Sequence, residues 1–143
     1  MPDSFVELPE LPILRIRADM SGGGPAAAMA ALEAKLPSLK GRRFYGCFRV
    51  LPEGEEYYAC VERIPSDDPD SMQVGSGVIP GGLYLRRKIP YWEDKIPSFA
   101  TNFQEMIATH DVDPDRPEVE YYRSQREAFL MVPVRGRREG SST

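Results

Sequence analysis

Residues Arg116–Val134, RPEVEYYRSQREAFLMVPV, place a carboxylate among aromatic side chains on a predicted β-strand. Successive side chains of a strand point to opposite faces, so Glu120 and Tyr122 share one face while Val119 and Tyr121 share the other. Burying an ionised carboxylate under a helix without a partner costs several kcal/mol. We therefore expect Val119 to pack against a helix, and Glu120 and Tyr122 to face a ligand cleft.

The segments around this strand follow one order twice. Alternating apolar residues predict the strands, and glycine, proline and apolar residues at helical spacing predict the helices. The first set is a strand from about Ile13 to Ala18, a helix within 21–38, and a hairpin of strands within 42–52 and 55–65. The second set is a strand within 78–90, a helix within 95–110 whose Phe99, Phe103, Met106 and Ile107 share a face, and strands within 118–124 and 128–134.

This order predicts an α+β fold of two duplicated strand-helix-strand-strand modules, with a ligand cleft between them. LPILRIR (11–17) resembles IPGGLYL (79–85) at an offset of 68, and FYGCFR (44–49) resembles EVEYYR (118–123) at an offset of 74. Each module is expected to cover one sheet face with its helix and to leave the other face to the cleft. We expect a single domain over 1–143, with module one at about 5–64, an acidic, solvated linker at 65–72, module two at about 73–134 and a disordered tail at 135–143.

The duplication predicts an asymmetric cleft. Gly46 falls where Glu120 lies in the second copy, and Phe48 falls where Tyr122 lies, so only one copy supplies a charge. Aromatic residues in strands serve either as core or as a ligand wall, and both interpretations stay open for each one. Besides Glu120 and Tyr122, the candidate wall residues are Trp92, Tyr84, Phe48 and Tyr91. Trp92, the only tryptophan, lies on a loop between prolines, where a large apolar side chain needs something to pack against.

Composition excludes several classes of protein. The 18 basic and 22 acidic residues give a formal net charge of -4, which argues against a general nucleic-acid binder. No apolar run approaches the roughly 20 residues that span a bilayer. The amino terminus, MPDSFVELPE, lacks the basic and apolar regions of a signal peptide. We expect a soluble, cytoplasmic protein without a membrane partner, as a monomer or weak dimer.

The two cysteines and the single histidine predict no metal site and no cofactor. Cys47 and Cys60 lack metal-ligand spacing and lie on the two strands of the predicted hairpin, roughly opposite each other. Buried thiols that pack as small hydrophobic groups are the favoured interpretation, with a cross-strand redox pair as the alternative. His110 ends the second helical stretch, where a cation interacts favourably with the helix dipole.

The quoted motifs together resemble a known family. LPILRIR, VIPGGLYL, DRPEVEYY and MVPV, in this order over roughly residues 5–134, resemble the gyrase-inhibitor-like (GyrI-like) small-molecule-binding domain. That domain also forms the effector-binding part of AraC-type and MerR-type multidrug regulators. The resemblance implies the duplicated fold, a cleft for amphipathic and often cationic aromatic compounds, and a glutamate in an RPxxExY motif. Here the motif is Arg116, Pro117, Glu120 and Tyr122.

Three functions follow from this resemblance. The first is binding of cationic or aromatic small molecules, as in drug or toxin sequestration, with Glu120 supplying the charge. The second is hydrolysis of cyclopropane-bearing DNA-alkylating compounds, with Glu120 as the general base. The third is inhibition of gyrase as a protein partner, for which the sequence holds no docking motif. An HxG feature of the family is absent, since Arg86–Trp92 reads RRKIPYW, and no DNA-binding segment is expected before Phe5.

Overall fold

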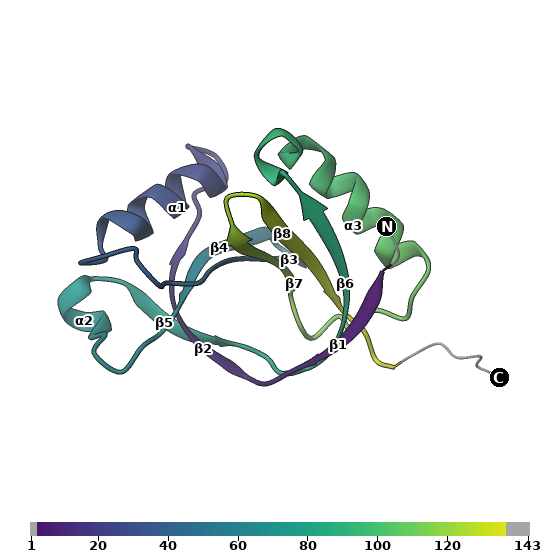
Figure 1. Ribbon diagram of the computed structural model, residues 1–143, viewed down its shortest axis with the longest axis horizontal. Helices are drawn as coiled ribbons and strands as arrows, with labels where there is room; N and C mark the ends of the chain where they lie inside the picture. Colours follow the sequence, from purple (N-terminus) through teal and green to yellow (C-terminus); the bar gives the residue numbers. More distant parts are fainter. Residues whose placement is uncertain (1–2, 137–143) are drawn as a thin grey trace. The chain divides into compact units, whose positions relative to one another are not determined.

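The computed structural model describes residues 3–136 of the 143-residue chain and divides into two compact units. Within the described residues, the first unit comprises 10–79, and the second comprises 3–9 and 80–136. Each unit contains four antiparallel strands and one α-helix of ten or more residues (Figure 1). The chain therefore has the predicted α+β fold of duplicated modules.

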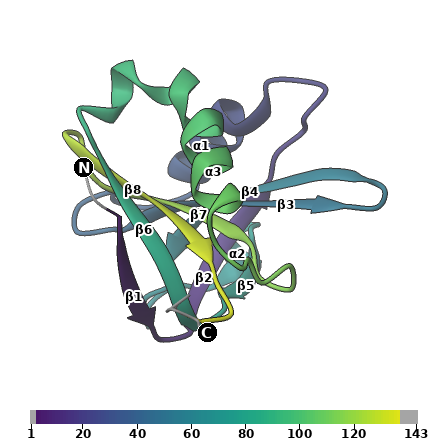
Figure 2. The ribbon, with the colours of Figure 1, turned by 90° about the vertical axis from the view of Figure 1, so that its right-hand side faces the viewer.

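In the first unit, four strands pair in the order β3-β4-β2-β5. Helix α1 contacts β2 and β4, and its first turn contains Pro25. Strands β3 and β4 form a long two-stranded ribbon (Figure 2). The elements are β2 (Leu11–Arg17), α1 (Gly24–Ala34), β3 (Phe44–Leu51), β4 (Gly54–Glu62), α2 (Pro69–Met72) and β5 (Gly75–Ile79).

In the second unit, four strands pair in the order β1-β6-β8-β7. Two 3₁₀ turns lead from β6 into helix α3, which contacts β8. The elements are β1 (Ser4–Leu8), β6 (Gly82–Pro90), η1 (Trp92–Asp94), η2 (Ile96–Ser98), α3 (Phe99–Ala108), β7 (Glu118–Ser124) and β8 (Glu127–Pro133).

The pairing registers define the internal repeat. Leu14 pairs with Val61 in the first unit, and Leu85 pairs with Val132 in the second, so Leu14 corresponds to Leu85 and Val61 to Val132. The predicted offset of 68 for the first strand, which aligns Leu14 with Gly82, is wrong, because it matched Pro12, which lies inside β2, with Pro80, which lies before β6. The offset of 74 between β3 and β7 agrees with the registers.

A repeated arginine–aromatic contact gives side-chain evidence for the same alignment. The Arg15 guanidinium lies 4.1 Å from the ring centre of Tyr58, and the Arg86 guanidinium lies 4.8 Å from that of Phe129. In the alignment that matches Leu14 with Leu85, the two arginines correspond to each other, and so do the two aromatic residues. The Phe129 ring also stacks on Tyr121, at a centroid distance of 6.2 Å.

The outer strands of the two units are exchanged along the chain. β1 comes before β2 in sequence but pairs with β6, and β5 comes before β6 but pairs with β2. Residues 5–8 were expected in module one and residues 75–79 in module two, whereas the strands that contain them pair with β6 and β2, respectively. Each segment completes the sheet of the other module.

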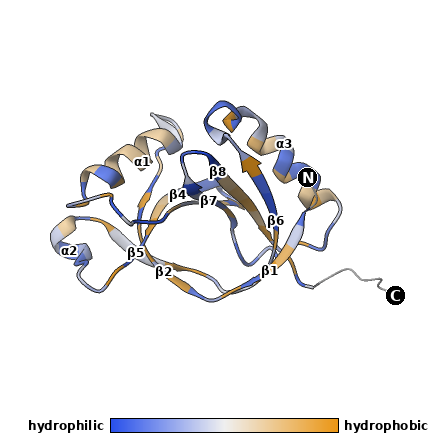
Figure 3. Cartoon of the chain, viewed as in Figure 1, coloured by the Kyte–Doolittle hydropathy of each residue, from blue (hydrophilic) through white to orange (hydrophobic). Residues whose placement is uncertain are grey.

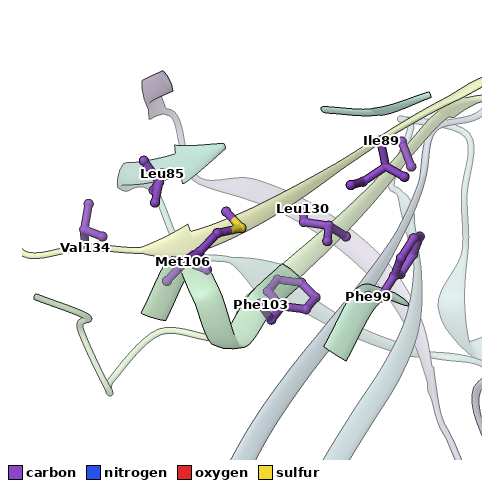
Figure 4. Close-up of a cluster of buried hydrophobic side chains, with 9 residues drawn as sticks. Leu85, Ile89, Phe99, Phe103, Met106, Leu130 and Val134 are labelled. Atoms are coloured by element: carbon purple, nitrogen blue, oxygen red, sulfur yellow. The ribbon is translucent and has the colours of Figure 1, made fainter. Parts of the chain in front are cut away.

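Each helix covers a hydrophobic core within its own unit. In the second unit, Phe99, Phe103 and Met106 of α3 point toward Leu85 and Leu130 (Figure 4). Ile107 packs against the same cluster, so the predicted apolar face of this helix is confirmed. Hydrophobic and hydrophilic residues alternate along α3, as expected for a helix with one exposed side (Figure 3). In the first unit, Leu14, Ala28, Leu32, Tyr57, Ala59 and Val61 are among the core residues.

The segment 65–72 is more than a solvated connection. Asp67 bonds Arg42 at 2.7 Å, and only 3% and 5% of these side chains are exposed. The Asp67 carboxylate also accepts the backbone N–H of Ile64. The Asp67 carboxylate is buried because it holds this loop against the buried guanidinium of Arg42.

The predicted tail, 135–143, lies mostly outside the described residues. No helix within residues 3–136 is long and apolar enough to cross a membrane.

The cysteines and the histidine lie close to their predicted places. Cys47 and Cys60 are buried and free, and their sulfur atoms lie 3.8 Å apart. They are diagonal rather than opposite, because Cys47 pairs with Tyr58 across the hairpin. His110 follows the end of α3, with its Nδ1 atom 3.1 Å from the Met106 carbonyl oxygen.

Candidate functional site

Glu120 and Tyr122 lie on the same face of β7, as predicted, but this face is the one that α3 covers. The Tyr122 ring packs against the core cluster that contains Phe99 and Phe103 of α3. Val119, which points the other way, is fully buried opposite Met131. The expectation that Val119 contacts the helix and Glu120 faces away from it is therefore wrong.

Partial exposure and a hydrogen-bond partner explain why a carboxylate is tolerated on this face. The buried strand residues of the core cluster belong to β6 and β8. On β7, Glu118, Glu120 and Tyr122 are half-buried rather than buried. The carboxylate of Glu120 also has a partner, since the Tyr122 hydroxyl donates a hydrogen bond of 2.5 Å to its Oε1 atom. A half-buried, hydrogen-bonded carboxylate avoids most of the cost of burial without a partner.

Trp92 joins this pair from the turn η1. Its ring lies 4.8 Å from the Tyr122 ring, tilted by 57°. Its indole N–H donates a hydrogen bond of 2.7 Å to the Ser124 carbonyl oxygen at the end of β7. Trp92 therefore has a fixed place against Tyr122, whose hydroxyl binds the Glu120 carboxylate.

The residue before Trp92 turns outward. Tyr91 adopts a left-handed backbone conformation, with φ of 52°, and its side chain is 63% exposed. Its backbone N–H is bonded to the Arg126 carbonyl oxygen at 2.6 Å, which fixes the start of the turn. Tyr91 thus positions the loop that carries Trp92, and its own ring lies at the surface.

The other two predicted wall residues lie elsewhere. Tyr84 is fully buried on the opposite face of β6 from the α3 core, with its hydroxyl bonded to the Pro80 carbonyl oxygen at 2.6 Å. Phe48 belongs to the first unit and packs against its helix-covered core. Of the six predicted site residues, the structure brings together Glu120, Tyr122 and Trp92.

Glu118 was not among the predicted site residues. It precedes Glu120 by two residues on β7, so strand alternation places both carboxylates on one face. Burial of the Glu118 carboxyl, and then the nearby charge of Glu120, raise its pKa to about 7. The parity that grouped Glu120 with Tyr122 would also have identified Glu118, so the signal was present in the sequence.

Arg116 of the RPxxExY motif has a structural position. Its Nε donates to Asp113 at 2.8 Å, its Nη2 donates to the Val134 carbonyl oxygen at 2.8 Å, and its guanidinium lies 4.9 Å from the centre of the Tyr84 ring. Gly82, with φ of 133°, leaves space for it, because a Cβ atom at this residue would lie 2.5 Å from Nη1. Arg116 therefore stabilises the segment that leads into β7, and its contacts lie outside the carboxylate site.

No family model matches the sequence, and no curated protein matches it. Solved structures match over nearly the whole chain. A structure of SAV2435 bound to tetraphenylphosphonium covers 99% of this chain and 98% of its own, with a TM-score of 0.69 at 12% identity. An integron cassette protein from the mobile metagenome of Vibrio cholerae covers 93% and 95%, with a TM-score of 0.63 at 14% identity. A hydrolase from Listeria innocua covers 92% and 90%, with a TM-score of 0.59 at 13% identity.

These likenesses, at identities of 14% or less, concern the fold. They agree with the duplicated arrangement of strands and helices and with the order of the motifs in the sequence. They confirm the predicted resemblance at this level: the chain has the fold of the GyrI-like small-molecule-binding domain.

Proposed function

We propose that this protein binds amphipathic, cationic aromatic small molecules at the face of β7 that carries Glu120, Tyr122 and Trp92. The observation that supports this function most directly is the hydrogen bond from Tyr122 to the half-buried Glu120 carboxylate, together with the packing of the Tyr122 ring on Trp92. A delocalised cation is attracted to such a place by the charge and by the ring faces, and each cation–π contact contributes about 0.5–2 kcal/mol.

The ligand class has independent support from the fold comparison. SAV2435, which shares the fold, has been solved with tetraphenylphosphonium, a bulky aromatic cation. Its identity to this chain is 12%, so the ligand is carried over as part of the proposal. Sequestration of a drug or toxin is the simplest use of such a site in a protein of this size.

A matched pair of ions tests the proposal. Tetraphenylphosphonium and tetraphenylborate have nearly the same shape and opposite charge, and Trp92, the only tryptophan, reports binding through its fluorescence. We expect tetraphenylphosphonium to bind more tightly than tetraphenylborate. We expect Glu120→Gln to weaken binding of the cation roughly tenfold, without weakening binding of the anion.

The control is Glu7→Gln, which removes one negative charge from an exposed position on β1. β1 and β7 are three strand spacings apart in the order of the unit, about 14 Å, so this variant should bind like the unmodified protein. Equal losses for both ions in Glu120→Gln, or equal affinities of the unmodified protein for both, would contradict the charge role of Glu120.

Hydrolysis of a strained electrophile is the second candidate function, and Glu118 favours it. A carboxyl with a pKa of about 7 next to another carboxylate can give or take a proton at neutral pH. The fold is shared with a Listeria hydrolase. Incubation with a cyclopropane-bearing alkylator should then release its water adduct in many-fold excess over protein, as seen by mass spectrometry. Protection limited to one equivalent, without adduct, would indicate binding alone.

A further inference from the structure

The two carboxylates of β7 have different surroundings. Glu120 accepts the hydroxyl of Tyr122, whereas Glu118 makes no hydrogen bond or ion pair within residues 3–136. Two residues along a strand correspond to about 6.6 Å, so the face holds two acids at a defined spacing. The second acid is half-buried and loses much of its hydration without gaining a donor.

Three basic residues on the strands of this unit form ion pairs with other acids. Arg87 binds Asp3 and Glu105, and Lys88 and Arg123 both bind Glu127. The charged group that acts on Glu118 within the described residues is Glu120, which has the same sign. The neighbouring strand β8 contributes Leu130 and Val132 to this face, and both are apolar. Within residues 3–136, no basic side chain forms a hydrogen bond or ion pair with Glu118.

We propose that Glu118 is the second anionic group of the site, and that it selects aromatic ligands with two positive charges over ligands of the same ring system with one. This inference rests on the proposed function, since the first charge and the ring occupy the place beside Glu120, Tyr122 and Trp92. The second charge then lies beside Glu118, about 6.6 Å along β7 from the first charge.

The selectivity is expected to depend on pH. Burial and Glu120 raise the pKa of Glu118 to about 7, so this carboxyl is mostly protonated at pH 6 and mostly ionised at pH 8. A second positive charge favours the ionised form, and binding of a dication near pH 7 should therefore release a fraction of a proton. A ligand with one charge, held by Glu120, should release much less.

Ethidium and propidium are suitable probes, because they share a phenanthridinium ring and carry one and two fixed charges between pH 6 and pH 8. Both are titrated by fluorescence against the unmodified protein, Glu118→Gln, Glu120→Gln and the control Glu7→Gln. We expect the ratio of propidium affinity to ethidium affinity to rise roughly five- to tenfold from pH 6 to pH 8 in the unmodified protein and in Glu7→Gln. In Glu118→Gln the ratio should be independent of pH.

Calorimetry in buffers of different ionisation enthalpy supplies a second measurement that needs no variant. It should show proton release with propidium at pH 7 and little with ethidium. Tight binding of both dyes that depends on Glu120, but with a ratio unaffected by Glu118→Gln, would overturn the role of Glu118 and leave cation binding intact. Failure of both dyes and of tetraphenylphosphonium to bind would overturn the proposed function, and this inference with it.

Discussion

At the scale of single residues, hydrogen-bond partners distinguish two chemically identical side chains. Glu118 and Glu120 share one strand face, but only Glu120 has the Tyr122 hydroxyl as a donor. Strand alternation correctly predicted that Glu120 and Tyr122 lie together. It did not predict which face the helix covers. The expected face followed from the cost of burying Glu120 without a partner, whereas Tyr122 provides a hydrogen-bond partner.

Replacement of Glu118 by glutamine tests its surroundings without any ligand. The pKa of this carboxyl is raised from 4.5 to about 7 by folding, so between these values the folded state binds more protons than the unfolded state. The free energy of unfolding therefore decreases as pH rises through this window, and the decrease is complete above pH 7. Glu118→Gln, which resembles the protonated form, should remove the decrease.

The expected gain in stability of Glu118→Gln is about 1–3 kcal/mol at pH 8 and close to zero at pH 4, where both states are protonated. Urea unfolding at pH 4, 6 and 8 measures it, with Glu7→Gln as the exposed control. A gain of the same size at all three pH values would show that Glu118 is destabilising for a reason other than its charge.

At the scale of elements, local patterns were sufficient for the helices and the hairpin. Helix α3 followed from apolar residues at helical spacing, and the β3–β4 hairpin followed from two alternating runs around a turn. Strand β5, with the sequence GSGVI, has no alternating pattern and was joined to the next strand instead. Its place depends on pairing with β2, which is separated from it in the chain by α1 and the whole β3–β4 hairpin and is therefore invisible to local periodicity.

The turn that carries Trp92 shows the same limit in the candidate site. The sequence predicted that this side chain packs against something, because it lies between prolines on a loop. Its partners are the Tyr122 ring and the Ser124 carbonyl oxygen, both on β7, which the chain reaches only after α3. The type of contact was predictable from the residue, whereas its location required the fold. Tyr84 and Phe48 show the same limit, since aromatic residues on strands fit a core as well as a ligand wall, and the structure packs both away from Glu120.

At the scale of the whole molecule, each unit depends on a strand from a distant part of the sequence. β1 contributes Phe5 to the core of the second unit, and Asp3, just before it, bonds Arg87 on β6. The first unit depends in the same way on β5, which pairs with β2. Because β1 and β5 are exchanged, neither unit is built from one of the two predicted modules alone. The stability of each unit therefore includes a strand that the sequence places beside the elements of the other unit.

A chain that starts at Glu10 tests this dependence. Loss of β1 removes the pairing of five residues with β6, the burial of Phe5 and the Asp3–Arg87 ion pair, so we expect a loss of at least about 3 kcal/mol in the free energy of unfolding. It also leaves an open edge on β6, which favours pairing between copies. Chemical unfolding and light scattering measure the two effects, and a peptide of residues 1–9 should reverse both, whereas a scrambled peptide should not. An unchanged free energy of unfolding, with a monomer at all concentrations, would show that the exchanged strand is dispensable for the second unit.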